Sequence, residues 1–332
     1  MKIVVDSAIP FLRGVLEPYA EVQYMAGAAI SSQECRTADA LVVRTRTKCN
    51  EALLQGSAVQ MIATATIGSD HIDFDYCRSH SIRTATAAGC NARGVLQWVA
   101  AVLAHLSKRD GFQPCERVLG IVGVGHVGSL VEEYARRWGF RTVVCDEPRR
   151  LNEGFASQSV EEAFAQADIV TLHVPLDKTT RYMVDTAMIG CMRSGAVLLN
   201  SSRGEVVANK ALLSRDDIEF ALDVWEGEPL LDAEVLNRSL LSTPHIAGYS
   251  EQGKAMATAM AVRQIADHFG LPLVDWYPSG VAKSCPQDIG WEAMTGSIAD
   301  YFDIVGESRR LRENPSLFEE LRNDYSYRRE YF

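Results

Sequence analysis

The stretch VLGIVGVGHVG, residues 118–128, decides the fold of this chain. It begins with the apolar run Val118–Val122, which is typical of a strand covered on both faces. Three glycines follow with the spacing G-x-G-x-x-G, and a helical pattern continues from there to Trp138. A strand, a glycine-rich turn and a helix in this order predict a parallel sheet with a dinucleotide site at the turn.

Each glycine of the turn has its own task in such a site. Gly123 permits the tight turn, Gly125 lets the backbone approach a pyrophosphate, and Gly128 lets the helix pack on the strand. The helix then begins at His126 and Val127, whose free N–H groups would face the phosphates. The sequence alone also allows a glycine turn that binds nothing.

Asp146 indicates which dinucleotide is bound. It ends the next predicted strand, Thr142–Cys145, at the spacing typical of the acid that binds the ribose hydroxyls. A carboxylate there would repel a 2′-phosphate, which favours NAD over NADP. Arg149 and Arg150 follow closely and favour the opposite choice, because arginines can bind a 2′-phosphate.

Three downstream segments carry the side chains that hydride transfer at a hydroxy acid requires: SSRG at 201–204, DVWEGEP at 223–229 and PHIAGY at 244–249. His245 is the candidate base, because an imidazole titrates near neutral pH. Glu228 would hold the imidazole in one tautomer, and Arg203 would bind a substrate carboxylate. Asp223, at a predicted strand end, would bind the nicotinamide carboxamide.

Each of these residues also has a structural alternative. Arg203 would then lie at the surface of a turn, and Glu226 and Glu228 would be solvated loop acids. His245 would satisfy a backbone carbonyl. The ordered set of all three segments favours the catalytic interpretation.

The rest of the chain alternates short apolar runs with helical patterns, which predicts βαβ units in two parallel sheets. Helices are predicted from Ala92 to Lys108 and from Ser250 to Phe269. Further strands are predicted at Lys2–Val5, Ala40–Val43, Gln60–Ala63, Ile82–Thr84, Ile169–His173, Ala196–Asn200, Glu219–Val224 and Leu240–Thr243. We therefore expect a substrate domain of residues 1–92 and 249–275, an inserted NAD-binding domain of residues 93–248, and a C-terminal segment of residues 276–332.

Composition excludes several other classes of protein. The chain has 332 residues, a hydrophobic share of 47% and a net charge of −10, which argues against general binding to nucleic acid or an anionic membrane. No apolar run approaches the roughly 20 residues of a membrane span. Eight scattered cysteines without a C-x-x-C pair and without a secretion signal indicate reduced thiols in a cytoplasmic protein. His71, Asp73 and Asp75 share one loop with no second cluster, so no metal site is expected.

These motifs resemble the D-isomer-specific 2-hydroxyacid dehydrogenase family over nearly the whole chain, to about Leu271. The resemblance implies that Arg203, Glu228 and His245 are the catalytic trio. It also implies a flavodoxin-like substrate lobe and an NAD-binding Rossmann lobe, with the active site in a cleft that closes on binding. Further cofactor contacts are implied at Val174, Ser201, Ser202 and Gly248.

A narrower resemblance points to a branch of this family that oxidises 4-phospho-D-erythronate on the route to pyridoxal 5′-phosphate. It rests on residues 41–48, 64–71 and 89–92 and on the DVWEGEP and HIAGY segments. That branch carries a C-terminal dimerisation module, which residues 317–325 and 328–330 resemble in a shorter form. The implied assembly is a homodimer.

A phosphorylated substrate needs cations away from the reacting carbon. Arg44, Arg46 and Lys48 follow a predicted strand end in the first lobe, and Thr45 lies between them. The resemblance adds Thr66, Tyr249 and Arg328 as substrate contacts, with Arg328 reaching the phosphate from the partner subunit. The alternatives are an exposed basic loop and a terminal arginine paired with surface acids.

Two other functions remain open from the sequence. One is another D-2-hydroxyacid dehydrogenase, acting on 3-phosphoglycerate or on glyoxylate and hydroxypyruvate; the tail rich in arginine and tyrosine argues against it. The other is an NAD-responsive protein similar to the C-terminal-binding corepressors, which keep the same trio. Such a protein would bind a peptide motif and turn over hydroxy acids poorly.

Overall fold

Five parallel strands form the sheet of the first of two units, in the order β2-β1-β3-β4-β5. This order is that of a flavodoxin-like sheet. The strands are β1 (Lys2–Asp6), β2 (Glu21–Met25), β3 (Ala40–Val43), β4 (Met61–Thr64) and β5 (Arg83–Thr86). Their buried Val, Ile, Leu and Ala side chains explain why the central strands read as continuous apolar runs.

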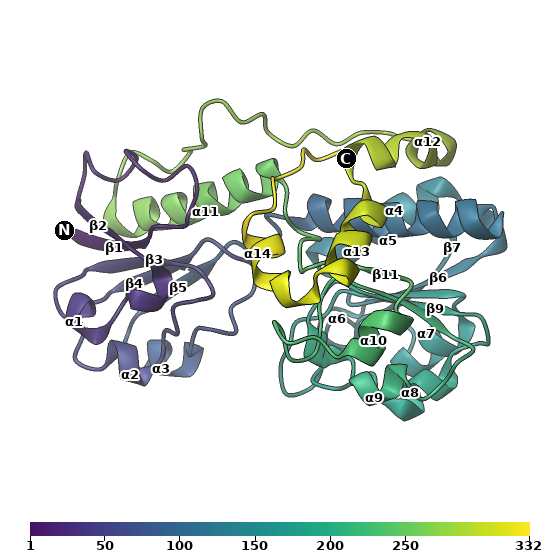
Figure 1. Cartoon of the computed structure of the whole chain (residues 1–332). Coiled ribbons are helices and arrows are strands. Elements are labelled where there is room, and N and C mark those ends of the chain that lie inside the picture. The colour runs from purple at the N-terminus through teal and green to yellow at the C-terminus, as the bar shows by residue number, and fades with distance from the viewer. The chain divides into compact units, whose positions relative to one another are not determined.

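Helices cover both faces of this sheet (Figure 1). The long helix α11 (Glu251–Phe269) packs Val262 and Ile265 against Ile3, Val5 and Val42 on one face. The other face is covered by three short helices, α1 (Ser32–Cys35), α2 (Glu51–Leu54) and α3 (Phe74–Ser79). Helix α11 spans Glu251–Phe269 and begins at the N-cap Ser250, whose side chain accepts a hydrogen bond from the Gly253 amide.

Six parallel strands form the sheet of the second unit, in the order β11-β10-β9-β8-β6-β7. They are β6 (Val118–Val122), β7 (Arg141–Cys145), β8 (Ile169–Leu172), β9 (Val197–Asn200), β10 (Glu219–Leu222) and β11 (Leu241–Ser242). Strand β6 lies between β7 and β8, so the chain changes direction across the sheet at β6. Ligands of open parallel sheets bind at such a switch point, outside the carboxyl ends of the strands.

Two layers of helices enclose the second sheet. One layer contains α4 (Ala92–Asp110) and α5 (His126–Trp138) and is extended by α12 (Trp291–Tyr301) and α13 (Ile304–Glu313). The other contains α7 (Val160–Gln166), α8 (Thr186–Cys191), α9 (Asn209–Leu212) and α10 (Ala233–Arg238), and α14 (Phe318–Asn323) packs its Phe318 into the same core. Helix α6 (Glu147–Glu153) follows β7, and 3₁₀ turns lie at Gly27–Ala29, Pro114–Glu116, Gly204–Val206 and Pro315–Leu317.

The C-terminal segment is held on the second unit by aromatic packing. Phe332 is almost fully buried and lies edge-on to Tyr134 with a centroid distance of 4.9 Å. Trp291, at the start of α12, packs against Trp138 and Phe140 at 5.7 and 5.3 Å. Such contacts are worth about 0.5–1.5 kcal/mol each beyond the buried area.

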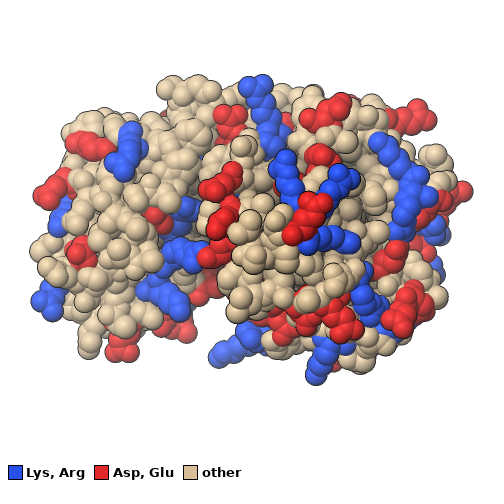
Figure 2. Space-filling view, in the orientation of Figure 1, with Lys and Arg blue, Asp and Glu red and all other residues tan.

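The structure, a computed structural model, describes all residues from Met1 to Phe332. The first unit comprises Met1–Asn91 and Ser250–Lys283, and the second comprises Ala92–Tyr249 and Ser284–Phe332. Most of the segment that the sequence set apart, residues 276–332, therefore packs within the second unit. None of the helices combines the length and the apolar character needed to cross a membrane. Acidic and basic side chains are interspersed over the visible face, without an extended basic surface (Figure 2).

The two α/β units and their parallel sheets confirm the predicted fold class. The predicted helices and all ten predicted strands lie within a few residues of their observed positions, whereas the strand β2 (Glu21–Met25) was not predicted. Its side chains are only half-buried at the edge of the sheet, so its apolar signal is weak.

Candidate active site

The predicted cofactor residues gather at one edge of the second sheet. Because its strands are parallel, their carboxyl ends meet at the same edge. Gly123, Asp146 and Asp223 are the first residues after β6, β7 and β10. Val174 is the second residue after β8. Ser201 and Ser202 follow β9 in the same way.

The glycine turn has the geometry of a phosphate cradle. Gly123 has a φ of 87°, and a Cβ there would lie 2.5 Å from the carbonyl oxygen of His173. A Cβ on Gly128 would meet the Gly123 carbonyl at 1.9 Å, so only glycine permits this helix–strand approach. Gly125 is exposed with nothing within 4 Å of the Cβ position, which leaves the start of α5 open to a ligand. His126 and Val127 form the first turn of α5.

Asp146 and Arg149 bear on the choice between NAD and NADP. The Asp146 carboxylate accepts hydrogen bonds from the amides of Val124 at 2.8 Å and Arg149 at 3.0 Å, which fix its position beside the glycine turn. The Arg149 guanidinium is bonded to Glu153 and to the Val124 carbonyl, at 2.9 Å each. Arg149 is therefore occupied within the protein, which favours a cofactor without a 2′-phosphate.

Arg203 lies directly before Gly204, a position at which only glycine fits. It directly follows Ser202 and precedes the 3₁₀ turn Gly204–Val206, and its Nη1 donates to the Ser202 carbonyl at 2.7 Å. A Cβ on Gly204 would lie 2.0 Å from the carbonyl carbon and oxygen of Trp225. The absence of a side chain at 204 thus lets the Arg203 turn approach the backbone that leads to Glu228.

The candidate base and its carboxylate are hydrogen-bonded. His245 Nδ1 lies 2.8 Å from Glu228 Oε2, so Nδ1 carries the proton and Nε2 remains as the base. Glu228 Oε1 accepts the Trp225 amide at 2.8 Å. Burial raises the pKa of Glu228, but the charge and hydrogen bond of His245 and the Trp225 amide outweigh it and hold the pKa below its usual value. The pair thus contains an ionised carboxylate.

The other glutamate of this segment is engaged elsewhere. Glu226 Oε1 accepts the Tyr182 hydroxyl at 2.9 Å, and its Oε2 accepts the Asn209 amide at 2.8 Å. The choice between Glu226 and Glu228 as the partner of His245, which the sequence left to the family pattern, is therefore supported by geometry.

Asp223 holds the segment that follows His245. Its Oδ1 accepts the Thr243 hydroxyl at 2.6 Å and the Ile246 amide at 2.8 Å, and its Oδ2 accepts the Ala247 amide at 2.9 Å. The side chain is 1% exposed, and burial raises its pKa although the His245 charge and these hydrogen bonds act in the opposite direction. The network fixes His245, whose φ of 58° is in the left-handed region.

Arg328 lies on the same segment rather than in solvent. Its Nη1 donates to the carbonyls of Ile246 at 2.9 Å and Tyr249 at 3.1 Å, and its Nη2 donates to those of Gly94 and Ala247. Arg328 as a residue is 8% exposed, and its guanidinium lies over the ring of Phe302. Arg328 was predicted to bind a substrate phosphate. In this structure its Nη atoms instead donate to backbone carbonyls of its own subunit.

The remaining cofactor residues border the same edge. Ser202 is 7% exposed, and its amide and hydroxyl both donate to Asn200 Oδ1. The Ser201 hydroxyl is buried without a hydrogen-bond partner in the protein, as expected of a group that awaits a ligand or water. Val174 packs partly into the core, and Gly248 lies half-buried beside Tyr249.

In the first unit, the predicted substrate residues follow two neighbouring strands. Arg44, Thr45 and Arg46 come directly after β3, and Thr66 follows β4, which pairs with β3. Arg44 Nη1 donates to the Ala8 carbonyl at 3.2 Å, and Thr66 is bonded to Thr64 at 2.7 Å. Thr45 and Arg46 are exposed.

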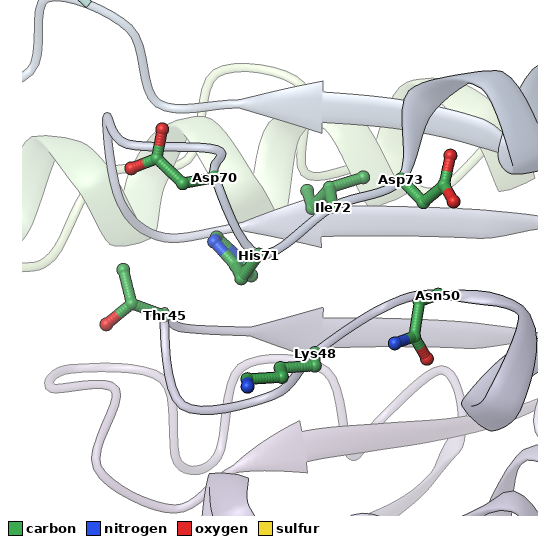
Figure 3. A pocket seen from close by; sticks show the side chains of 7 residues that line it. All are labelled: Thr45, Lys48, Asn50, Asp70, His71, Ile72 and Asp73. Carbon is green, nitrogen blue, oxygen red and sulfur yellow. The ribbon is translucent and has the colours of Figure 1, made fainter. Parts of the chain in front are cut away.

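A cavity of about 440 Å³ adjoins this basic loop. Figure 3 shows that the loop after β3 and the loop after β4 line it from opposite sides, with His71 between them. The lining residues are Thr45, Lys48, Asn50, Asp70, His71, Ile72 and Asp73. The structure contains no group of three or more His, Cys, Asp or Glu side chains arranged to hold a metal ion.

Gly204→Ala should disrupt the site through the backbone. The added methyl group would collide with the Trp225 carbonyl, and overpacking of this kind costs about 1–3 kcal/mol. We expect a lower melting temperature together with a loss of kcat/KM, measured by thermal unfolding and steady-state kinetics. Gly190→Ala in α8 is the control, because nothing lies within 4 Å of its Cβ position and alanine favours helix. Equal behaviour of the two variants would contradict the close approach at Gly204.

Comparison with known proteins agrees with this geometry. Residues 91–247 match the family "D-isomer specific 2-hydroxyacid dehydrogenase, NAD binding domain". The chain is 40% identical to erythronate-4-phosphate dehydrogenase of Bacteroides fragilis, with 99% of this chain and 97% of that protein covered. It is 42% identical to erythronate-4-phosphate dehydrogenase of Ectopseudomonas mendocina, with 99% and 93% covered.

A solved structure shares the fold. NAD⁺-bound 3-phosphoglycerate dehydrogenase of Entamoeba histolytica is 25% identical, with a TM-score of 0.69, and the match covers 85% of this chain and 99% of that one. The matched NAD-binding domain includes the glycine turn, Asp146, Arg203, Glu228 and His245. With its NAD-binding domain and near full-length similarity, this chain belongs to the erythronate-4-phosphate dehydrogenase family of D-isomer specific 2-hydroxyacid dehydrogenases.

Proposed function

We propose that this protein oxidises 4-phospho-D-erythronate to (R)-3-hydroxy-2-oxo-4-phosphooxybutanoate with NAD, a step in the synthesis of pyridoxal 5′-phosphate. The observation that carries the proposal is the 2.8 Å hydrogen bond between His245 and Glu228 in an NAD-binding domain whose full-length relatives bear this enzyme's name.

The chain's own residues handle the proton and the substrate carboxylate. His245 Nε2 takes the proton of the C2 hydroxyl, and Glu228 stabilises the imidazolium that forms. Arg203 holds the substrate carboxylate and polarises the C2 oxygen. NAD, when bound, accepts the hydride from C2, so that the alcohol becomes a ketone and one proton remains on His245.

The residues at the carboxyl edge of the second sheet fit this cofactor. Gly123, Gly125 and Gly128 leave room for a pyrophosphate at the start of α5, and Asp146 suits the ribose hydroxyls. The unpartnered Ser201 hydroxyl is a further polar group available to a ligand. The other contacts that we propose are His126, Val127, Val174, Ser202, Asp223 and Gly248.

We propose that the basic loop after β3 recognises the substrate phosphate. Arg46 and Thr45 are exposed there, and Arg44 and Thr66 lie at neighbouring strand ends. Two guanidinium groups suit a phosphate dianion, because arginine binds it with two parallel hydrogen bonds. Tyr249 is the substrate contact that we propose on the second unit.

We also propose a homodimer that works in the cytoplasm. Four large apolar side chains of the C-terminal segment are exposed and suit an interface between copies: Tyr301, Val305, Leu317 and Tyr327. All eight cysteines are free thiols, three of them exposed, which suits a reducing compartment. Light scattering at several concentrations measures the assembly.

The test is NADH formation by the purified protein with 4-phospho-D-erythronate, 3-phospho-D-glycerate and unphosphorylated D-erythronate. A 2-oxo acid is supplied in parallel, so that reduced cofactor retained on the enzyme is reoxidised. We expect turnover of the first substrate and a loss of about 10²-fold or more in kcat/KM without the phosphate, as charge-assisted hydrogen bonds of this kind imply.

Other results of this assay would point to a different function. Preference for 3-phospho-D-glycerate or for glyoxylate in the reverse direction would leave a D-2-hydroxyacid dehydrogenase with another substrate. NAD binding without turnover of any acid would contradict the enzyme assignment and favour a corepressor-like binding protein. Arg46→Gln should abolish the discrimination between phosphorylated and unphosphorylated acid, and an unchanged ratio would exclude the basic loop from phosphate recognition.

A further inference from the structure

The guanidinium of Arg322 lies beside the catalytic pair. Arg322 belongs to α14 in the C-terminal segment, and the neighbouring Phe318 and Leu321 anchor that helix in the core of the second unit. Its Nη1 is 3.9 Å from Glu228 Oε2, the same oxygen that accepts the hydrogen bond from His245 Nδ1. Its Nε donates to the Tyr249 hydroxyl at 3.2 Å.

The side chain is well placed to act on the pair rather than on solvent. Arg322 retains 24% of its side-chain exposure, and Glu228 retains 19%. Its pKa is raised: burial alone would lower it, but Tyr249, Glu228 and Asp223 outweigh the burial, so the guanidinium remains charged. A fixed positive charge at this distance acts strongly in a partly desolvated site.

Arg328 fixes the other end of the same arrangement. Four backbone carbonyls accept from its Nη atoms, three of them between Ile246 and Tyr249, directly after His245. The two arginines therefore join the C-terminal segment to the base, to its carboxylate partner and to Tyr249. All of these residues belong to the second unit.

We propose that Arg322 is a positioning residue of the active site, which holds the Tyr249 phenol and limits the negative charge that Glu228 presents to His245. The C-terminal segment is then part of the active site of its own subunit. This inference rests on the proposed function of His245 as the base. It deepens that function by adding a fourth group to Arg203, Glu228 and His245.

The sign of the effect follows from charge. The imidazole must be neutral to accept the hydroxyl proton, and the Glu228 carboxylate favours the imidazolium. Arg322 opposes Glu228 and so favours the neutral, active form. The other charged or titratable groups of this arrangement are Asp223, whose charge interacts with that of His245, Tyr249 on the same segment, and Tyr325 and Arg328 from the C-terminal segment.

Arg322→Gln tests the proposal through the pH profile of kcat/KM for hydroxy acid oxidation. Removal of the positive charge that lies 3.9 Å from Glu228 should move the acid limb of the profile to higher pH by on the order of one unit. Below that limb kcat/KM should fall about tenfold, because one pH unit corresponds to that change in the neutral fraction. Arg322→Lys keeps the charge, so its acid limb should lie close to that of the parent protein.

The controls separate this role from a structural one. Arg329→Gln removes an exposed arginine of the same segment and should leave the profile unchanged. NAD affinity, measured by fluorescence, and the melting temperature of Arg322→Gln should stay near those of the parent protein. A loss of activity that is equal at every pH, or an acid limb that does not move, would overturn the proposal.

A second readout does not depend on turnover. The pKa of His245 can be measured by NMR in protein labelled at histidine, with His245→Asn as the assignment control. We expect a higher pKa in Arg322→Gln than in the parent protein, and an equal pKa would overturn the inference. A parent protein that turns over no hydroxy acid but shows this pKa difference would refute the proposed function, and with it the catalytic role of Arg322, while the electrostatic effect of Arg322 on His245 would remain.

Discussion

An enzyme with asparagine in place of His245 should oxidise its hydroxy acid with a kcat about 10²- to 10⁴-fold lower, the usual contribution of a general base. The pH dependence of kcat/KM near neutrality should disappear with it, because His245 Nε2 is the group that must be neutral for turnover. The measurement is steady-state NADH formation over a range of pH.

Asparagine is the informative substitution because of the backbone. His245 has a φ of 58°, and asparagine is among the residues that best tolerate this left-handed conformation. The amides around Asp223 and Trp225 should then stay in place, so that the loss reports chemistry and not a displaced loop. Alanine at 245 would add backbone strain to the loss of the imidazole.

His80→Asn is the matched control. His80 is an exposed histidine at the C-cap of α3 in the first unit, and the substitution should leave kcat and NAD affinity unchanged. If His245→Asn kept the activity of His80→Asn, another group would have to be the base.

The sequence predicted the elements whose signal is local. The run Val118–Val122 and the glycine turn predicted β6, the start of α5 and the cofactor edge, because each signal lies within a few consecutive residues. The trio could also be anticipated, since Arg203, Glu228 and His245 each follow a predicted strand of one parallel sheet. Parallel strands bring their carboxyl ends together whatever their separation in sequence.

The C-terminal helices carried a weaker signal. Trp291, Met294 and Ile298 have the spacing of one helix face and are buried in the second unit, but Thr295, Gly296 and Ser297 between them are weak helix formers. The roles of Arg322 and Arg328 had no local signal at all. They depend on where α14 and the last residues pack, which is a tertiary property.

The hydrogen bonds of Asp223 are a second feature that the sequence did not predict. A carboxylate after a strand of this edge was predicted to bind the cofactor, and the structure adds three hydrogen bonds that tie it to the segment after His245. Their partners, Thr243, Ile246 and Ala247, come from the region around β11, so sequence spacing could not reveal them. The network makes Asp223 a support of the base, whatever contact it makes with NAD.

Arg203→Ala should lower kcat/KM by about 10²- to 10⁴-fold, which corresponds to the loss of two hydrogen bonds to a charged carboxylate. The loss should appear in KM for the hydroxy acid and also in kcat, because Arg203 both binds the carboxylate and polarises the C2 oxygen. NAD affinity should be retained, since the glycine turn and Asp146 are untouched. Arg203→Lys should recover only part of the loss, because an ammonium group lacks the planar pair of donors.

Arg193→Ala is the control for a lost guanidinium in the same unit. Arg193 is exposed and pairs with Asp168 at 3.2 Å, at the amino end of β8 and therefore at the opposite edge of the sheet. Its removal should change stability by no more than about 1 kcal/mol and leave kcat/KM unaltered. If Arg203→Ala behaved like Arg193→Ala, the substrate carboxylate would have to be bound by another cation, and the mechanism would have to be rebuilt around His245 and Glu228 alone.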